Sequence, residues 1–417
     1  MNNANIQPVN GGVCAPKGFS AGGVHCGIAK KADKKDLALI FSEQPCTAAA
    51  TYTTNKVQAA PIRTTMAHLA DGTARAILCN SGNANACNAD GDRVAAQMCQ
   101  LAAKALGILA EDVVVASTGV IGVPLPIGPI EGGIESLVKA LDATEKGSDD
   151  CAAAIMTTDT AKKEIAVTVE IGDKTVTIGG ICKGSGMIHP NMATMLAFVT
   201  TDAAISAGML QKALSAVVKD TFNMVSVDGD TSTNDMCTVL ANGMAGNAEI
   251  TGTGEDFAAF TAGLRAVCLY MAKAIAKDGE GATKLLECAV TGAKDETSAR
   301  VLAKSVITSS LFKAAMFGAD ANWGRVLCAM GYADADFDPL KVSVSFASAA
   351  GVIQVCKDGG SLSFSEERAK EILTQNEIEI LIALADGEGK AVEGHSAVAW
   401  GCDLTYDYVK INGDYRS

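Results

Sequence analysis

Apolar side chains recur every three or four residues in three stretches of the chain, as they do on the buried face of a helix. The longest stretch is 255–277, and shorter ones cover 92–107 and 206–219. Asp92 stands where a cap of the first helix is expected, and Gly107 stands where that helix would end. The pattern therefore predicts helices over these three ranges.

Apolar residues alternate with polar or small ones in other stretches, which is typical of half-buried strands. Residues 165–171 alternate, Gly172-Asp173 offers a turn, and the alternation returns over 176–178, so a hairpin is expected. Residues 342–346 alternate in the same way, and 377–384 predicts one more strand.

Helices and strands are mixed along the chain without strict β-α-β alternation. This order favours a mixed α/β fold, either α+β or a layered α/β sandwich, over a doubly wound nucleotide-binding fold. The chain has 417 residues, enough for more than one domain. Because glycines interrupt the chain at 278–281 after the long helix, we expect a main domain over 1–284 and a smaller α/β domain over 285–417.

Charge and cysteine content narrow the class of protein. The formal net charge of -13 argues against a protein that coats nucleic acid or an anionic membrane, because either task needs clustered cations. The first residues lack the charged start and apolar run of a secretory signal, and no apolar run reaches the ~18 residues of a membrane helix. The 14 cysteines form neither C-x-x-C nor zinc-finger spacings, which favours reduced, mostly buried thiols in a cytoplasmic protein.

Common catalytic and metal motifs do not fit this chain. It has 4 histidines, none in H-E-x-x-H, and it contains neither a P-loop nor G-x-S-x-G. The acidic run 228–235 lacks the glycine and glutamate of a calcium loop. Ser310-Leu-Phe-Lys313 spells S-x-x-K without its companion motifs and is better interpreted as the start of a helix. We expect no metal and no cofactor.

The chemistry is concentrated in residues 180–202, GICKGSGMIHPNMATMLAFVTTD. A glycine-rich loop begins at Lys183, and a strand-like run follows Thr194, while His189 is interpreted as part of the loop. If the bond between Ala193 and Thr194 were cut, Thr194 would carry a free α-amine, whose pKa near ~7.7–8.0 suits a general base. That amine would activate the adjacent hydroxyl as a nucleophile. On the residues alone, the alternative is that Thr194 merely starts a strand.

This segment resembles the ornithine acetyltransferase family of arginine biosynthesis, the bifunctional ArgJ proteins. Their processing motif, K-G-S-G-M-I-x-P-x-M-A-T-M-L, is matched by residues 183–196. Other blocks that resemble the family follow in order along nearly the whole chain, which argues against a chance likeness. They lie at 15–19, 53–61, 80–85, 117–122, 156–159, 227–235, 278–284, 318–325 and 402–412. The chain ends in Ser417, where many members end in Thr, so a hydroxyl is kept.

The resemblance implies a precursor that cleaves itself before Thr194 into chains 1–193 and 194–417, which stay together as a heterotetramer of two α and two β chains. It also implies the layered αββα-type sandwich that the family shares with self-processing aminopeptidases. Thr194 would take acetyl from N2-acetyl-L-ornithine and pass it to L-glutamate by ping-pong covalent catalysis. The sequence leaves open whether acetyl-CoA is a second donor.

The resemblance implies the remaining site residues as well. The oxyanion hole maps to Thr118 and Gly119, for which the structural alternative is a turn after a strand at 113–115. Lys183 would bind a substrate carboxylate and Glu280 a substrate ammonium, although a glutamate among glycines more often lies in a solvated turn. The pocket would be completed by Thr157 or its neighbour Thr158, by Asn412 and by Ser417.

Two other functions stay open on the sequence. The same self-processing machinery with water as acceptor would be an N-terminal-nucleophile amidohydrolase or aminopeptidase. A chain that never releases Thr194 would be a non-catalytic scaffold. Two bands on a denaturing gel separate the enzymes from the scaffold, and formation of N-acetylglutamate separates the transferase from the hydrolase.

Overall fold

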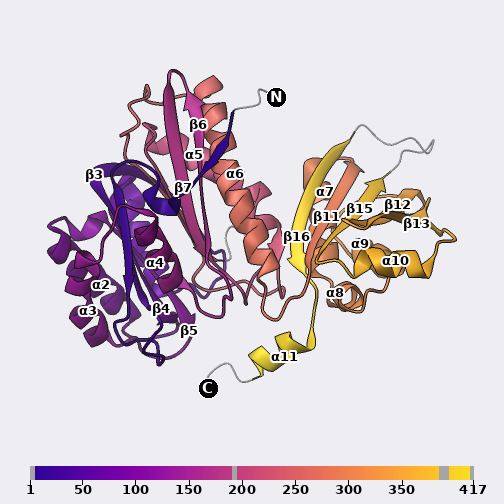
Figure 1. The fold of residues 1–417 in the computed structure, drawn as a ribbon, viewed down its shortest axis with the longest axis horizontal. Coiled ribbons are helices and arrows are strands. Elements are labelled where there is room, and N and C mark those ends of the chain that lie inside the picture. Colours follow the sequence, from indigo (N-terminus) through magenta and orange to yellow (C-terminus); the bar gives the residue numbers. More distant parts are fainter. Residues whose placement is uncertain (1–4, 190–194, 385–393, 414–417) are drawn as a thin grey trace. The chain divides into compact units, whose positions relative to one another are not determined.

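The computed structural model describes residues 5–189, 195–384 and 394–413 of the chain. The chain divides into two compact units, which interleave along the sequence (Figure 1). Unit 1 comprises Met1–Gly184, Pro190–Asn223 and Thr231–Met271, and unit 2 comprises Ser185–His189, Met224–Asp230 and Ala272–Ser417. The last change of unit falls between Met271 and Ala272, inside a helix, whereas the sequence places a domain boundary after residue 284.

Unit 1 is built on a mixed sheet, which has nine strands in the described part of the chain. The strands lie in the order β1, β6, β7, β8, β10, β3, β4, β5, and β2 pairs with β3. The β8–β10 and β4–β5 pairs are parallel, and the other pairs are antiparallel. The bounds are β1 (Gln7–Val9), β2 (Phe19–Val24), β3 (Leu37–Tyr52), β4 (Thr73–Asn83), β5 (Val113–Val120), β6 (Lys163–Ile171), β7 (Lys174–Lys183), β8 (Leu196–Thr201) and β10 (Met236–Ala241).

Helices cover this sheet because each turns one apolar stripe toward it. Helices α2 and α3 pack side by side on the β3–β5 part of the sheet (Figure 1), where Val94, Met98 and Leu137 are buried. Helix α4 lies so close to β2 that a Cβ on Gly23 would come 2.2 Å from the carbonyl oxygen of Asp150. The bounds are α1 (Ala60–His68), α2 (Gly91–Leu106), α3 (Ile127–Lys139), α4 (Glu145–Ile155), α5 (Ala207–Asp220) and α6 (Glu255–Lys277).

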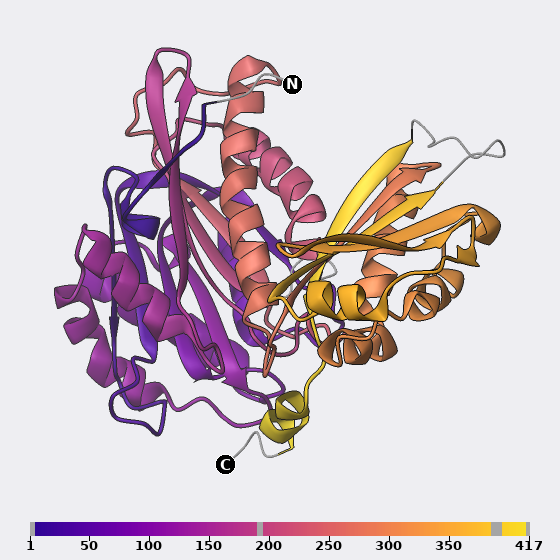
Figure 2. The same ribbon diagram turned by 45° about the vertical axis from the view of Figure 1, so that its right-hand side comes forward.

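Helix α6 is, among the described residues, the one helix that is long and apolar enough to cross a membrane by length and composition alone. A core helix passes the same test. The side chains of Phe260, Leu264 and Val267 on α6 are fully buried. A Cβ on Gly180 of β7 would come 2.9 Å from Val267, so the helix packs directly on the sheet (Figure 2). These contacts indicate a core helix.

Unit 2 holds a second mixed sheet, with seven strands in its described residues, in the order β14, β13, β12, β15, β11, β16, β9. The β11–β15 and β16–β9 pairs are parallel, and the others are antiparallel. Helix α7 packs on β16, where a Cβ on Gly401 would come 2.4 Å from Ile307. The bounds are β9 (Val225–Ser226), β11 (Leu285–Ala293), α7 (Glu296–Thr308), α8 (Ser310–Phe317), α9 (Trp323–Gly331), β12 (Val342–Ser348), β13 (Gly351–Lys357), β14 (Gly360–Ser361), α10 (Glu366–Leu373), β15 (Glu377–Leu384), β16 (His395–Cys402) and α11 (Tyr406–Asn412).

The mixed α/β class and the predicted elements are confirmed. The three predicted helices are α2, α5 and α6, the predicted hairpin is β6–β7, and the two further strands lie in β12 and β15. Gly172 in the hairpin turn has φ +60°, a value that glycine adopts without strain. One detail is wrong: the N-cap of α2 is Asp90 rather than Asp92, and its side chain makes no capping hydrogen bond.

Strand β8 begins shortly after Thr194, the first residue of the expected chain 194–417. All its residues are buried, because β7 pairs with it on one side and β10 on the other. Met195, just before the strand, accepts a hydrogen bond at its carbonyl oxygen from the Met236 N–H at 2.8 Å. The residue after Thr194 is therefore anchored in the middle of the sheet.

Candidate active site

The proposed oxyanion pair lies at the end of β5. Thr118 and Gly119 pair in parallel with Ser81 and Gly82 of β4, so they belong to a strand and the alternative of a turn is wrong. Gly119 has φ +131°, and a Cβ there would come 2.3 Å from the carbonyl carbon of Gly82. Only glycine fits this position, because a side chain would clash with the neighbouring backbone.

Asn234 holds the backbone of this strand and was not identified from the sequence. Its Nδ2 donates to the carbonyl oxygen of Ser117 at 2.8 Å and to that of Ala84 at 2.6 Å, and its Oδ1 accepts from the Thr233 hydroxyl at 2.6 Å. The Ser117 carbonyl belongs to the same peptide group as the Thr118 N–H. Asn234 therefore fixes the plane of the peptide that leads into the oxyanion pair. Its only sequence signal is its place in the polar run 228–235.

Replacing Asn234 by Ala is expected to lower kcat roughly 10- to 100-fold with little change in KM, because an oxyanion donor displaced by a fraction of an ångström stabilises the transition state less. Asn247→Ala is the matched control. Asn247 is 7% exposed against 6% for Asn234, and its Nδ2 likewise donates to two carbonyl oxygens, those of Ala204 and Ala248. Steady-state kinetics and thermal melting of both variants separate a loss of catalysis from a loss of stability. Equal losses of kcat in both would show that Asn234 supports the fold alone.

Lys183 ends β7 and faces a buried carboxylate. Its Nζ lies 3.9 Å from Oδ2 of Asp159, whose Oδ1 pairs with Lys163 Nζ at 2.8 Å. Asp159 also accepts from the backbone N–H of Thr157 and of Gly184. Burial alone would raise the pKa of the Asp159 carboxyl, but the Lys183 and Lys163 ammonium groups hold it below its usual range. Asp159 is therefore charged and attracts the Lys183 ammonium.

Thr157 and Thr158, which the sequence did not separate, both lie half-buried just before β6. The Thr157 N–H donates to Asp159 at 3.0 Å, and the Thr157 carbonyl oxygen accepts from Lys34 Nζ at 3.3 Å. The structure thus brings Thr157 and Lys183 together around one carboxylate. Lys34 was not identified from the sequence.

Ala193, Thr194 and Ser417 lie outside the described residues. The nearest described neighbour of Thr194 along the chain is Met195, which adjoins the carboxyl of Asp235. Burial raises the pKa of Asp235 well above its usual range, although a Ser232 hydrogen bond, the Lys183 charge and the Met195 backbone lower it. Among the described residues, Oδ2 of Asp235 has no hydrogen-bond partner. A buried carboxyl group whose pKa is raised by burial therefore lies beside the residue that follows the candidate nucleophile.

Glu280 and Asn412 meet within unit 2. Glu280 is only 6% exposed, so the alternative of a solvated turn is wrong. Its Oε2 accepts from Asn412 Nδ2 at 2.7 Å, and its N–H donates to the Ser185 carbonyl oxygen at 3.0 Å. A Cβ on Gly186 would come 2.3 Å from Oε2 of Glu280, so the glycine of the processing motif makes room for this carboxylate.

His189 is bound within unit 2 and is poorly suited to act as a base. Its Nδ1 lies 3.1 Å from the Ser226 hydroxyl. Burial, with a smaller contribution from the Lys304 charge, lowers the pKa of His189 to about 4. The loop before it is held by Asp228, which accepts from the N–H groups of Met187 and Ile188. These contacts agree with the interpretation of His189 as loop structure.

Metal chemistry has no arranged ligand set in the part of the chain that the structure describes. No group of three His, Cys, Asp or Glu side chains there could hold a metal ion. The 14 cysteines, all of which are described, are free thiols.

Comparisons with known proteins identify the family. The model of the ArgJ family matches residues 20–417. The chain belongs to the ArgJ family. A curated ArgJ relative, "Arginine biosynthesis bifunctional protein ArgJ 1" of Clostridium acetobutylicum, is 51% identical over 100% of this chain and 98% of its own length. The ArgJ protein of Symbiobacterium thermophilum is 52% identical over 98% of this chain and 99% of its own length.

Two solved ArgJ-family structures are also similar to this chain. The arginine biosynthesis bifunctional protein of Bacillus halodurans is 44% identical, covers 46% of this chain and 100% of its own, and has a TM-score of 0.44. Ornithine acetyltransferase of Mycobacterium tuberculosis, solved with ornithine, is 38% identical, covers 45% of this chain and 100% of its own, and has a TM-score of 0.43.

Proposed function

We propose that this protein transfers acetyl from N2-acetyl-L-ornithine to L-glutamate in arginine biosynthesis, as a self-processing enzyme whose nucleophile is Thr194. The observation that carries the proposal is the family match over residues 20–417, together with relatives near 50% identity over the full chain that are named as bifunctional ArgJ proteins. Thr194 is proposed as the nucleophile because it is the threonine of the processing motif that residues 183–196 match.

Processing would begin when the Thr194 hydroxyl oxygen attacks the carbonyl carbon of Ala193. The C–N bond breaks, the nitrogen takes up the proton that the hydroxyl loses, and an ester joins the two residues. Water then hydrolyses the ester, which leaves a carboxylate on Ala193 and a free α-amine on Thr194. The products are chains 1–193 and 194–417, for which we propose a heterotetramer of two α and two β chains in the cytoplasm.

Acetyl transfer would use the same hydroxyl. The neutral α-amine takes the hydroxyl proton while the oxygen attacks the acetyl carbon of N-acetylornithine, and the resulting ammonium protonates the departing ornithine amine. Thr118 and the Gly119 N–H would stabilise the oxyanion. Lys183 would bind the α-carboxylate and Glu280, with Asn412, the ornithine side-chain ammonium. Thr157 and Ser417 complete the proposed pocket. Glutamate then takes the acetyl group in the reverse sequence of steps.

Ping-pong kinetics test this function. Initial rates at several glutamate concentrations should give parallel double-reciprocal lines, because ornithine leaves before glutamate enters. Mass spectrometry after mixing with N-acetylornithine alone should show one acetyl group on chain 194–417 and none on chain 1–193. The pH profile of kcat/KM should rise through an apparent pKa of about 7.7–8.0 or lower, because a nearby cation such as Lys183 disfavours the ammonium form of the α-amine.

Two outcomes would contradict the proposal. Intersecting lines without an acetylated chain would mean direct transfer, and release of acetate with no N-acetylglutamate would mean that the protein is the amidohydrolase. The same assay with acetyl-CoA in place of N-acetylornithine decides whether acetyl-CoA is a second donor.

A further inference from the structure

Lys34 places its ammonium group beside Thr157, and in the described part of the chain this ammonium forms no ion pair with a carboxylate. The loop that carries it, between β2 and β3, is fixed by the buried Asp36, which accepts from the N–H groups of Cys26, Gly27 and Ala29. Lys34 is half-buried, and its Nζ donates to the Thr157 carbonyl oxygen at 3.3 Å. Among the described residues, no carboxylate oxygen lies within 4.0 Å of the Lys34 Nζ, the largest separation of an ion pair. An ammonium has three protons to donate, so two of them have no acceptor among the described residues.

The surroundings of Lys34 carry an excess of positive charge. Asp159 and Asp36 attract its ammonium, while Lys183 and Lys31 repel it. Asp159 is already shared by Lys183, Lys163 and two backbone N–H groups. Burial, the largest influence, lowers the pKa of Lys34. A half-buried cluster with more ammonium than carboxylate groups, in a chain of net charge -13, is suited to bind an anion.

The two substrates differ in the charge that this cluster would meet. Both N-acetylornithine and glutamate carry an α-carboxylate, which the proposed function assigns to Lys183. Ornithine has an ammonium at the end of its side chain, whereas glutamate has a second carboxylate. The Lys183 and Glu280 assignments leave that second carboxylate without a cation, and burying it unpaired would be costly.

We propose that Lys34 binds the side-chain carboxylate of glutamate and thereby selects the acetyl acceptor in the second half-reaction. The inference rests on the proposed function, because it uses the same pocket around Lys183 and Thr157. The ammonium of Lys34 donates to the carboxylate, a charge-assisted hydrogen bond that a neutral isostere of the substrate cannot make as strongly. Lys34 contributes little to N-acetylornithine, whose own side chain is positive.

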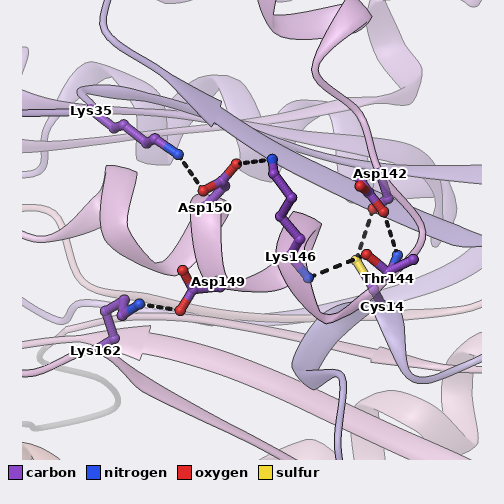
Figure 3. Close-up of polar contacts among 8 residues, drawn as sticks. All are labelled: Cys14, Lys35, Asp142, Thr144, Lys146, Asp149, Asp150 and Lys162. Atoms are coloured by element: carbon purple, nitrogen blue, oxygen red, sulfur yellow. Dashed lines mark hydrogen bonds and ion pairs between the residues drawn. The ribbon is translucent and has the colours of Figure 1, made fainter.

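Neighbouring lysines do not offer the same group. Lys163 already pairs with Asp159 at 2.8 Å. Lys35, the next residue after Lys34, pairs instead with Asp150 of α4, which also binds Lys146 (Figure 3). Lys162 pairs with Asp149 on the same helix (Figure 3). Lys35 therefore has a similar place in the sequence but a structural partner, which makes it the matched control.

The test compares Lys34→Gln with Lys35→Gln in the processed enzyme. Ping-pong kinetics yield a separate kcat/KM for each substrate. Lys34→Gln should lower kcat/KM for glutamate roughly 10- to 100-fold, the usual effect of losing a hydrogen bond to a charged group. The value for N-acetylornithine should change far less, and acetylation of chain 194–417 should proceed. Lys35→Gln should leave both values near those of the wild type.

Glutamine as acceptor supplies the second readout, because it has the shape of glutamate without the side-chain charge. The wild type should prefer glutamate strongly, Lys34→Gln should lose most of that preference, and Lys34→Arg should restore part of it. An unchanged glutamate-to-glutamine ratio in Lys34→Gln, or equal losses for both substrates, would overturn the inference. Absence of an acetylated chain in the wild type would instead refute the proposed function.

Discussion

Thr194→Ala is expected to remain a single chain of 417 residues with no measurable acetyl transfer. Alanine has no hydroxyl to attack the carbonyl of Ala193, so the bond that creates the nucleophile is not cut. Without that cut there is also no free α-amine to serve as base, and both parts of the N-terminal nucleophile are lost together. A denaturing gel and intact mass spectrometry measure the first loss, and N-acetylglutamate formation measures the second.

Two further variants make this result specific. Thr194→Ser keeps the hydroxyl and should still be cut, at an altered rate. Thr200→Ala removes a hydroxyl further along β8 that donates to the Val13 carbonyl oxygen at 2.8 Å, so it perturbs the same strand without touching the cleaved bond. Thr200→Ala should be processed. If Thr194→Ala gives two bands and is cut between residues 193 and 194, another residue or a protease cuts the chain.

Sequence patterns predicted those elements whose signal is local. The stripe of α6 repeats over 255–277, and the β6–β7 hairpin carries both alternation and a turn with Gly172 at positive φ. Each signal lies within one stretch of chain, so period and turn chemistry are sufficient to find it. The assignment of Thr194 as nucleophile, which comes from the contiguous residues of the family motif, stays a prediction because Thr194 lies outside the described residues.

Residues that contact distant parts of the chain could not be found in this way. Asn234 reaches Ser117, which lies 117 positions away in the sequence, and Lys34 reaches Thr157, which lies 123 positions away. Such pairs depend on strand order and register, which hydrophobic spacing does not determine. An asparagine or lysine in a polar run is typical of a solvated loop, and only burial against a particular carbonyl distinguishes these two.

The interleaving of the two units could not be predicted from the sequence for a related reason. Residues 185–189 and 224–230 belong to unit 2, although the chain on both sides of each belongs to unit 1. Strand β9 in the second segment has only two residues and joins the sheet of unit 2 beside β16. A strand this short shows no alternation, so its membership depends on pairing with a distant partner.

The second large effect is expected from Thr118→Ala, which should lower kcat roughly 10²- to 10³-fold, the usual loss for one oxyanion donor. The Thr118 hydroxyl is proposed to face charge that exists only in the tetrahedral intermediate, so KM for N-acetylornithine should change little. Gly119 remains, because its φ of +131° and its contact with Gly82 are properties of the backbone. If the Gly119 N–H is the second oxyanion donor, as proposed, it should still support part of the rate.

Thr65→Ala, a change on helix α1 at a residue that contacts the strand of Thr118, is the control for Thr118→Ala. The Thr65 hydroxyl donates to the Val115 carbonyl oxygen at 2.8 Å, so its loss disturbs β5 three residues before the oxyanion pair. Thermal melting should record a loss for Thr65→Ala, while kcat stays close to normal. A normal kcat in Thr118→Ala would remove Thr118 from the active site, whatever the stability of the variant.

Combining Thr118→Ala with Asn234→Ala tests how the hydroxyl is held. If Asn234 acts by orienting the peptide between Ser117 and Thr118, part of its effect passes through the Thr118 side chain and is already lost in Thr118→Ala. The double variant should then lose less kcat than the product of the two single losses, because coupled residues are not additive. Any loss of kcat that Asn234→Ala still causes in the Thr118→Ala variant measures how far Asn234 positions the Gly119 N–H. Full multiplicativity would mean that the two residues act on separate steps.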